Sequence, residues 1–406
     1  MATQRRPAAE GAPRIGATRW VALVAFTLLV VTTQVLWLTF ASVTEQTQAQ
    51  LGVSEGAVGD LAVINPIMFV LLAIPTGRWM DRRYAQALTA GALFTAAGAT
   101  LRLVDPSSYV WVFAGQAVMS VGQPLVLNAS TKIAARYFPP EEQTTAISIA
   151  SGAQFVGILT AVLTSSWLLD QGGFRLLLGA HAALAVVAAV AVIASLRLPH
   201  HATDTTGRAS LGWLRHDPLI WKLAGVLFVG FGTYNALATW LDAIMVGFGH
   251  GGVAGEMIAL TTLAGVVGAA VIPGFVASRE LRRDMVIATT LVLAAALLVI
   301  AAVPSPTLVR ILLALVGLFL LGTLPVVLDW SEIHVGPERA GSATGVLLLA
   351  GNLGGVVVVL TVQAVISHPV GALTVLALWA VPGLMIALRL PRRAGEHEAI
   401  EDEVLP

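Results

Sequence analysis

The chain has 406 residues, of which 57% are hydrophobic and 11% are charged, and its formal net charge is zero. This composition excludes a soluble globular protein, because too few polar residues are present to cover the surface of a chain this long. The absence of cysteine excludes disulfide bonds, thiolate metal sites and thiol catalysis.

Apolar stretches of about twenty residues follow one another along the chain, as helices that cross the hydrocarbon layer of a bilayer require. They cover residues 19–43, 57–76, 85–104, 109–137, 143–168, 175–197, 219–247, 256–278, 284–303, 307–330, 341–366 and 370–390. We therefore expect an all-α polytopic membrane protein with twelve transmembrane helices.

Polar segments divide the chain. Residues 1–18 lack the short apolar core and cleavage site of a signal peptide, so we expect a cytoplasmic tail there. One polar stretch interrupts the apolar body, and we interpret it as a cytoplasmic linker, residues 199–218, between an N-terminal six-helix half, 19–198, and a C-terminal six-helix half, 219–391. Residues 392–406 form an acidic tail, expected to be a solvated end.

The distribution of cations predicts the orientation, because Lys and Arg in short loops stay on the cytoplasmic side. With both termini inside, twenty of the 23 Lys and Arg residues fall on that side, and only Arg102, Arg175 and Arg310 fall outside. This imbalance supports an even number of spans in the cytoplasmic membrane, which in a bacterial cell is the inner membrane.

The two halves resemble each other at a constant offset of 197 residues. The offset carries Gly77 onto Gly274 and Arg82 onto Arg279, and it also carries Pro140-Glu141 onto Pro337-Glu338. An internal period of this length in an apolar chain indicates two halves related by pseudo-two-fold symmetry, with a binding site between them.

A polar and aromatic stripe is expected on the first span and on its repeat. Four residues at helical spacing form the stripe, and each has a partner at the repeat offset: Gln34, Trp37, Ala41 and Glu45, matched by Phe231, Tyr234, Ala238 and Asp242. A ring face and a carboxylate from each half form the pattern that an organic cation needs. Glu45 and Asp242 are interpreted as hydrated vestibule acids, and Trp37 fits a pocket or an interfacial aromatic belt equally well.

Gln123 lies near the middle of the fourth span. A carboxamide inside lipid needs a partner in a neighbouring helix or in a ligand. The bilayer midplane is where alternating-access carriers bind their cargo, so we favour substrate contact over a purely structural role.

The junction after the second span resembles the loop signature of the major facilitator superfamily. Gly77, Asp81 and Arg82 match its G-x-x-x-D-R pattern, and Gly274 and Arg279 partly repeat it, with Ser278 in place of the acid. The resemblance implies the major facilitator fold, and it implies that this motif latches neighbouring helix ends when the outer side is open. Asp81 is expected to offset the charge of a helix N-terminus and to pair with a cation such as Arg136.

A narrower resemblance covers about a third of the chain. The segments Gln123-Pro124, Thr145-Ala146-Ile147-Ser148 and Tyr234-Asn235-Ala236-Leu237 are similar to the feline leukaemia virus subgroup C receptor-related transporters, a family that moves choline and has been linked to haem. The resemblance implies that Trp37 and Tyr234, or its neighbour Asn235, form an aromatic cation box beside Gln123 and the span-eleven amide Asn352.

The sequence shows no phosphate loop, no cluster of metal ligands and no soluble catalytic domain, so we expect no enzyme, no cofactor, no metal and no nucleic-acid partner. The expected partners are a small-molecule solute and the lipid bilayer, and the chain is expected to act as a monomer. We interpret it as a secondary transporter of a small organic solute, cationic or choline-like, working by alternating access. Two alternatives stay open: a proton-coupled multidrug exporter, and a solute sensor that has a carrier fold but does not transport.

Overall fold

The computed structural model describes residues 16–199, 212–251 and 253–392, and this part of the chain is helical, with no strand. The N-terminal half contributes α1 (Thr18–Trp37), α2 (Thr44–Leu51), α3 (Glu55–Arg82), α4 (Tyr84–Leu101), α5 (Tyr109–Leu127), α6 (Ser130–Tyr137) and α7 (Pro140–Ser195). The C-terminal half contributes the short η1 (Gly212–His216), α8 (Pro218–Gly247), α9 (Ala254–Ser278), α10 (Arg282–Ala302), α11 (Pro306–Val335), α12 (Ala340–Gln363) and α13 (Pro369–Leu388).

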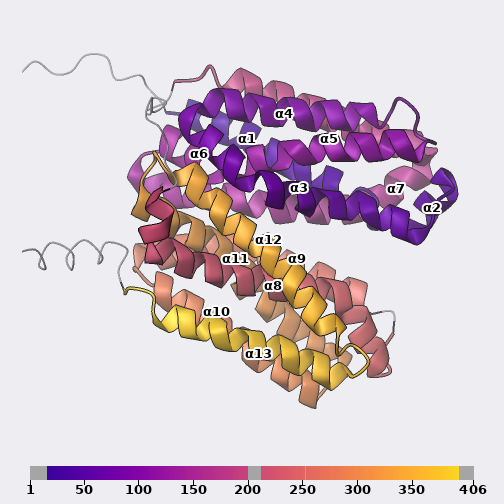
Figure 1. Cartoon of the computed structure of the whole chain (residues 1–406), viewed down its shortest axis with the longest axis vertical. Coiled ribbons are helices and arrows are strands. Elements are labelled where there is room, and N and C mark those ends of the chain that lie inside the picture. The colour runs from indigo at the N-terminus through magenta and orange to yellow at the C-terminus, as the bar shows by residue number, and fades with distance from the viewer. Residues whose placement is uncertain (1–15, 200–211, 252, 393–406) are drawn as a thin grey trace, which may run out of the picture.

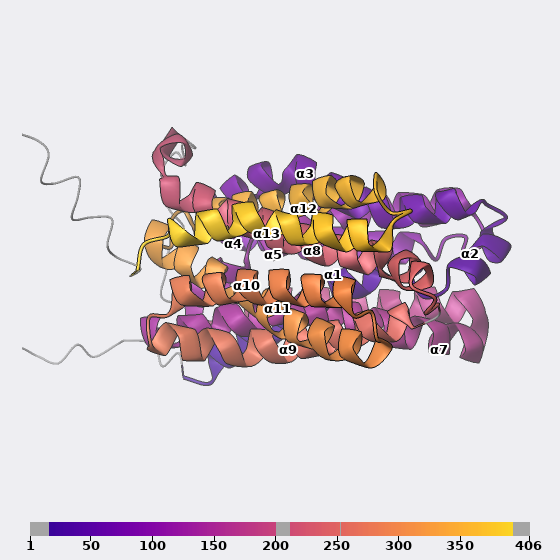
Figure 2. The ribbon, with the colours of Figure 1, turned by 90° about the horizontal axis from the view of Figure 1, so that it is seen from below.

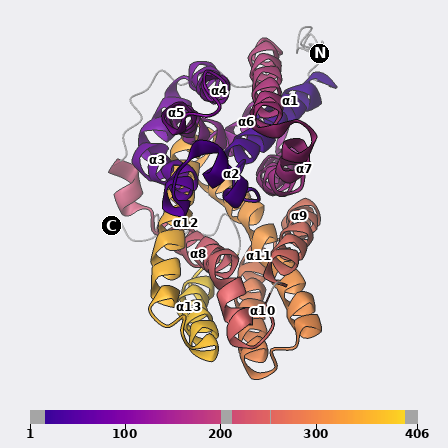
Figure 3. The ribbon, with the colours of Figure 1, turned by 90° about the vertical axis from the view of Figure 1, so that its right-hand side faces the viewer.

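The helices form two bundles that lie side by side, one from α1 to α7 and one from α8 to α13 (Figure 1). Viewed along the helices, the two bundles are separate clusters (Figure 3), and viewed from below their helices run along a common direction (Figure 2). We call the end where α1 begins and α13 ends the basic end, and the end that carries α2 the far end. The bundles meet at the basic end and diverge toward the far end (Figure 1).

Ten helices in the described residues are long and apolar enough to cross a membrane. One of them, α7, contains two spans, because Gly172 and Gly173 leave helical geometry and reverse the chain at the far end. Gly173 has a φ of 67°, which favours glycine. With both arms of α7, and with the 18-residue α4 packed beside α5, the described chain supplies the twelve crossings that the apolar stretches predict.

Local sequence signals explain where the helices begin. Pro140, Pro218, Pro306 and Pro369 open α7, α8, α11 and α13, at the position where a missing N–H costs no hydrogen bond. Asp217 also caps α8, since its carboxylate accepts hydrogen bonds from the backbone N–H groups of Leu219 and Ile220, both at 3.1 Å.

Three predicted boundaries are wrong. The first span ends at Trp37 rather than at residue 43, and turns lead from there to α2. The second span continues as helix through the basic motif to Arg82, so the predicted loop signature is the last turn and a half of α3. The fourth span breaks at Asn128 and Ala129, where the Asn128 side chain instead donates to the Ala73 carbonyl of α3 at 2.8 Å.

Most of the predicted linker and both predicted tails lie outside the described residues.

Candidate functional site

A central cavity of about 370 Å³ lies between the two bundles. Side chains from both bundles line it, and all six residues that the sequence predicts as substrate contacts are among them: Gln34, Trp37, Gln123, Tyr234, Asn235 and Asn352. They come from α1, α5, α8 and α12. The structure therefore brings these six residues to one space, whereas their role in binding stays a prediction.

Five aromatic side chains line this cavity, and two of them, Trp37 and Tyr234, come from different bundles and carry a polar atom. Trp37, at the last position of α1, donates its indole N–H to the Ala62 carbonyl of α3 at 2.9 Å. Tyr234 of α8 shares a hydrogen bond of 2.9 Å with the Thr262 hydroxyl of α9. Because the polar atom of each ring is already bonded inside its own bundle, the remaining aromatic surface is what each ring offers to a bound molecule.

Four carboxamides from the N-terminal bundle face the same cavity. Gln34, Asn65, Gln123 and Gln154 lie on α1, α3, α5 and α7, and each is at most 7% exposed. Within the described part of the chain, the amide nitrogens of Gln34, Asn65 and Gln154 have no hydrogen-bond partner. Buried polar groups are normally paired, so an unpaired set beside a cavity is suited to a polar ligand or to water.

The carboxamides of the C-terminal bundle differ. Asn235 and Asn352 each donate the amide N–H to the carbonyl four residues earlier in the same helix, at 2.9 and 2.8 Å. Their amide oxygens remain as acceptors on the cavity wall. The N-terminal side of the cavity thus has free donors and acceptors, and the C-terminal side mainly acceptors.

Of the two predicted vestibule acids, only Asp242 has a side chain within the described residues. Because α1 ends at Trp37, the stripe from Gln34 to Glu45 does not run along one helix, and Glu45 lies in α2 with its side chain outside the described residues. Asp242, on α8, is exposed and does not line the cavity. Among the described residues, no charged side chain lines this cavity.

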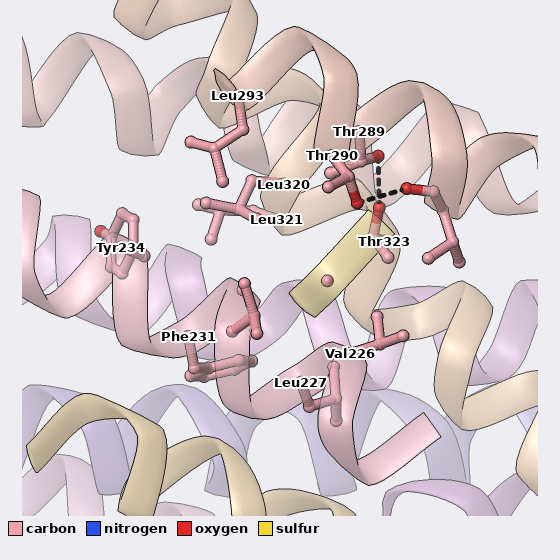
Figure 4. A pocket seen from close by; sticks show the side chains of 14 residues that line it. Val226, Leu227, Phe231, Tyr234, Thr289, Thr290, Leu293, Leu320, Leu321 and Thr323 are labelled. Carbon is pink, nitrogen blue, oxygen red and sulfur yellow. Dashed lines mark hydrogen bonds between the residues drawn. The ribbon is translucent and has the colours of Figure 1, made fainter. Parts of the chain in front are cut away.

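A smaller pocket of about 30 Å³ adjoins the central cavity inside the C-terminal bundle, and Phe231 and Tyr234 line both (Figure 4). Its polar wall consists of threonines whose hydroxyls are already bonded. Thr289 and Thr323 bond each other at 2.8 Å, and Thr290 donates to the Val286 carbonyl at 2.9 Å (Figure 4). The pocket therefore presents a mostly apolar surface.

At the basic end, Asp81 joins the two bundles. Its carboxylate accepts hydrogen bonds from the backbone N–H groups of Gly341 and Ser342, both at 2.9 Å, in the first turn of α12. A negative charge stabilises a helix N-terminus. Lys132 of α6 lies 3.2 Å from the same carboxylate. The cation suggested by the sequence, Arg136, has its guanidinium 5.0 Å from the centre of the Tyr84 ring.

The two glycines of the repeated motif differ in their surroundings. A Cβ placed on Gly77 would lie 2.7 Å from the Gly341 carbonyl oxygen, so this position requires glycine for close contact between α3 and α12. Gly274 is exposed, and a Cβ there would meet no described atom within 4 Å. Arg279 stacks on its neighbour Phe275 at 4.4 Å, and Arg82 is exposed. The second copy of the motif therefore makes no equivalent contact between the bundles.

Asp329 of α11 makes the corresponding contact from the C-terminal bundle. It accepts a hydrogen bond from the Thr144 hydroxyl of α7 at 2.6 Å, and the guanidinium of Arg282 holds its other oxygen at 2.8 Å. A third contact between the bundles joins the hydroxyls of Thr131 and Thr344 at 2.8 Å. These bonds close the basic end.

Sequence reasoning missed Asn65 and Gln154 as cavity residues. Asn65 precedes Pro66 inside an apolar stretch, and Gln154 lies in the middle of the first arm of α7, far from Gln143 and Gln171 at its two ends. An amide in the middle of an apolar span was the signal available for both, as it was for Gln123.

Comparison with known proteins shows the family. The model of the Major Facilitator Superfamily matches residues 14–359. The chain is 28% identical to solute carrier family 49 member A3 of Danio rerio, over 94% of this chain and 87% of that protein. It is 23% identical to the human choline/ethanolamine transporter FLVCR2, over 87% of this chain and 73% of that protein. Among solved structures, the E. coli fucose:proton symporter FucP matches with a TM-score of 0.74 at 15% identity, over 91% of this chain and 97% of that chain.

Proposed function

Because the chain belongs to the Major Facilitator Superfamily, we propose that it is a secondary transporter whose cargo is a small organic cation of the amine or choline class. The observation that carries this proposal is the composition of the central cavity: five aromatic rings, with Trp37 and Tyr234 from opposite bundles, six carboxamides and no charged side chain among the described residues.

This composition favours a weakly hydrated cation over an anion. A ring face attracts an organic cation by roughly 0.5 to 2 kcal/mol, more when water is excluded. The carbonyl oxygens of Asn235 and Asn352 supply further negative partial charge, and the free carboxamides of Asn65 and Gln154 suit a hydroxyl or amine at the other end of the cargo. An anion would meet no cation in the described lining.

The relatives support the same class of cargo. Human FLVCR2 is named as a choline/ethanolamine transporter, and choline and ethanolamine each combine an amine or quaternary ammonium group with a hydroxyl. The aromatic faces and the carboxamides of the cavity suit these two groups respectively. At 23% identity the relative supports the class of cargo rather than one compound.

We propose that the basic end faces the cytoplasm, as the rule of retained positive charge predicts for Arg19, Arg82 and Lys222. With that orientation, the contacts of Asp81 and Asp329 close the inner side, and the end at which the bundles diverge faces the outer side (Figure 1). Transport then requires the basic end to open and the far end to close around the same cavity.

Two measurements test this function. Purified protein is screened by thermal shift against choline, ethanolamine, neutral polyols, sugars and organic anions, since a ligand of the folded state raises the apparent melting temperature. Compounds that bind are then tested for uptake into proteoliposomes. Binding and saturable uptake of an organic cation support the proposal, whereas selective binding of anions or sugars contradicts it.

The same experiment separates the remaining alternatives. Binding without uptake identifies a sensor. A pH change inside the liposome that accompanies uptake identifies proton coupling, for which the described cavity lining supplies no Asp, Glu or His.

A further inference from the structure

Arg102 is a fully buried cation outside the central cavity. It follows the last residue of α4, has 0% of its surface exposed, and makes no ion pair with a carboxylate within the described residues. Its Nη1 donates to the Gln116 carboxamide oxygen at 3.1 Å and to the Thr39 hydroxyl at 3.3 Å. A buried charge without a counter-ion is costly, so something else in the fold must stabilise it.

The C-terminus of α1 supplies that stabilisation. The last carbonyls of a helix have no partner within it and carry the negative end of its dipole. Arg102 Nη1 approaches the Leu36 carbonyl at 3.5 Å, and the Gln116 carboxamide donates to the carbonyls of Leu36 and Trp37 at 3.4 and 3.3 Å. The ring of Phe40, just beyond the helix, lies 5.9 Å from the guanidinium.

These contacts also explain why the first span stops short of its predicted end. The apolar sequence continues through Leu38 and Phe40, but the carbonyls of Leu36 and Trp37, which would continue the helix, accept hydrogen bonds from Gln116 of α5, and that of Leu36 also from Arg102 just after α4 and from the Thr39 hydroxyl. The helix therefore ends at Trp37, whose backbone carbonyl is bonded to Gln116 while its indole N–H is bonded to Ala62. Hydrogen bonds thus hold both the backbone that carries the Trp37 side chain and the indole N–H of its ring.

We propose that Arg102 is a positioning residue for cargo recognition: through Gln116 it caps α1 and sets the orientation of the Trp37 ring in the central cavity. The functional part of this inference rests on the proposed function, since it takes Trp37 to contact the cargo. A ring displaced by about 1 Å from its productive position loses much of its contribution to binding.

A purely structural role for Arg102 predicts a different pattern. Loss of a buried cap would then lower stability and the amount of folded protein, with the Trp37 ring and the affinity of the remaining folded molecules unchanged. Thr39 links this cap to the buried His181 imidazole, which lies 3.0 Å from its hydroxyl, so a general loosening of the N-terminal bundle is the competing explanation.

The test uses the full chain labelled with 5-fluorotryptophan, in which the Trp37 resonance is identified by its loss in Trp37→Phe. Arg102→Gln is compared with Arg102→Lys and with Arg175→Gln, which removes an exposed arginine of α7 at the same far end. We expect the Trp37 resonance to move or broaden in Arg102→Gln, to recover partly in Arg102→Lys because the positive charge is kept, and to stay in place in Arg175→Gln.

In proteoliposomes, Arg102→Gln is expected to raise the KM for the organic cation at least about fivefold, with kcat within about twofold, because a misplaced contact weakens binding of the cargo. If Arg102→Gln does not fold, Gln116→Met removes the bonds to the Leu36 and Trp37 carbonyls while leaving the arginine in place, and the same two readouts apply. An unmoved Trp37 resonance in folded variants overturns the proposal. A moved resonance in a protein that transports no cation keeps the positioning role and rejects the proposed function instead.

Discussion

The Asp81 carboxylate of one bundle caps the other bundle's α12 by accepting the backbone N–H of Ser342 at 2.9 Å. This contact exists only while the basic end is closed, so it favours the conformation seen here over one in which the bundles separate at that end. The same carboxylate offsets the Lys132 ammonium, 3.2 Å away.

Asp81→Asn is therefore expected to shift the protein toward a state with an open basic end. Loss of the charge removes about 1 to 2 kcal/mol from the helix cap and leaves Lys132 without its carboxylate. The chain has no cysteine, so a single Thr344→Cys reports on opening, because Thr344 is fully buried between the bundles. Its rate of labelling by a thiol reagent should rise about tenfold, as 1.4 kcal/mol corresponds to a factor of ten. Arg82→Gln, which replaces an exposed residue next to Asp81, serves as the control. An equal rise in the labelling rate in that variant would contradict the capping role of Asp81.

Gly77→Ala is expected to impair the closed basic end sterically. The added methyl would lie 2.7 Å from the Gly341 carbonyl oxygen, which belongs to backbone and cannot move without displacing α12. The control is the repeat-related Gly274→Ala, whose methyl has no described atom within 4 Å. The same Thr344→Cys reporter should label faster in the first variant and at the unmodified rate in the second. Equal behaviour of the two variants would show that contact with α12 does not control closure.

The fold could be predicted from the sequence because lipid imposes one strong constraint: every crossing must be an apolar helix. The end of α1 is a boundary that depends on side chains far away in sequence. Arg102 and Gln116 bond its last carbonyls together with the nearby Thr39 hydroxyl, and the two distant partners cannot be predicted from the residues around Trp37.

The candidate site was predictable in part for a similar reason. A carboxamide or an aromatic ring at the right depth of a span can be read from the sequence, and the repeat offset links Trp37 to Tyr234. The partner of Asp81 could not be read, because Ser342 is 261 residues away and contributes its backbone. The predicted continuous stripe on the first span was wrong because it assumed an unbroken helix from residue 34 through residue 45.

The two aromatic rings should matter more for charged cargo than for neutral cargo. Trp37→Ala and Tyr234→Ala are each expected to weaken binding of an organic cation by roughly 0.5 to 2 kcal/mol, whereas a neutral analogue of the same shape loses only apolar contact. The measurement is a competition assay with choline and its uncharged carbon isostere. Trp167→Ala, which removes a 60% exposed ring of α7, is the control. Equal losses for both ligands would leave the rings with a packing role only.

Replacing the unpaired carboxamides should separate affinity from stability. The side chains of Gln154 and Asn65 make no hydrogen bond to a described protein group. Gln154→Leu and Asn65→Leu therefore leave no protein group without a hydrogen-bond partner, and the melting temperature without ligand should stay the same or rise. Affinity for a hydroxyl-bearing cargo should fall by about 1 kcal/mol for each lost hydrogen bond.

Asn128→Leu is the matched control for these two variants. Its amide donates to the Ala73 carbonyl and the Thr76 hydroxyl, so its loss should lower the melting temperature. If Gln154→Leu instead destabilised the protein as strongly as Asn128→Leu, the carboxamide would be structural.

Asp217 connects the start of α8 to the end of α11, because its second oxygen lies 2.9 Å from His334 Nε2. Burial alone would raise the pKa of Asp217, but the hydrogen bonds from His334 and from the Ile220 and Leu219 amides hold it below its ordinary value. A carboxyl whose pKa is lowered on folding stabilises the protein above its unfolded pKa, and this stabilisation disappears as the pH falls through the folded pKa.

Two substitutions separate the helix-capping contribution of Asp217 to stability from the contribution of its charge. Asn keeps the ability to cap α8 but loses the charge, whereas Ala loses both, so the Asp217→Ala variant should be less stable than Asp217→Asn by about 1 kcal/mol. The advantage of the unmodified protein over Asp217→Asn should be present at pH 6, should begin to fall below about pH 4, the ordinary pKa of an aspartate, and should be lost once the pH is below the lowered pKa of the folded state. Thermal unfolding in detergent across this range measures both differences. An advantage that persisted unchanged at pH 3 would mean that the carboxylate charge contributes nothing and that shape alone holds α8 to α11.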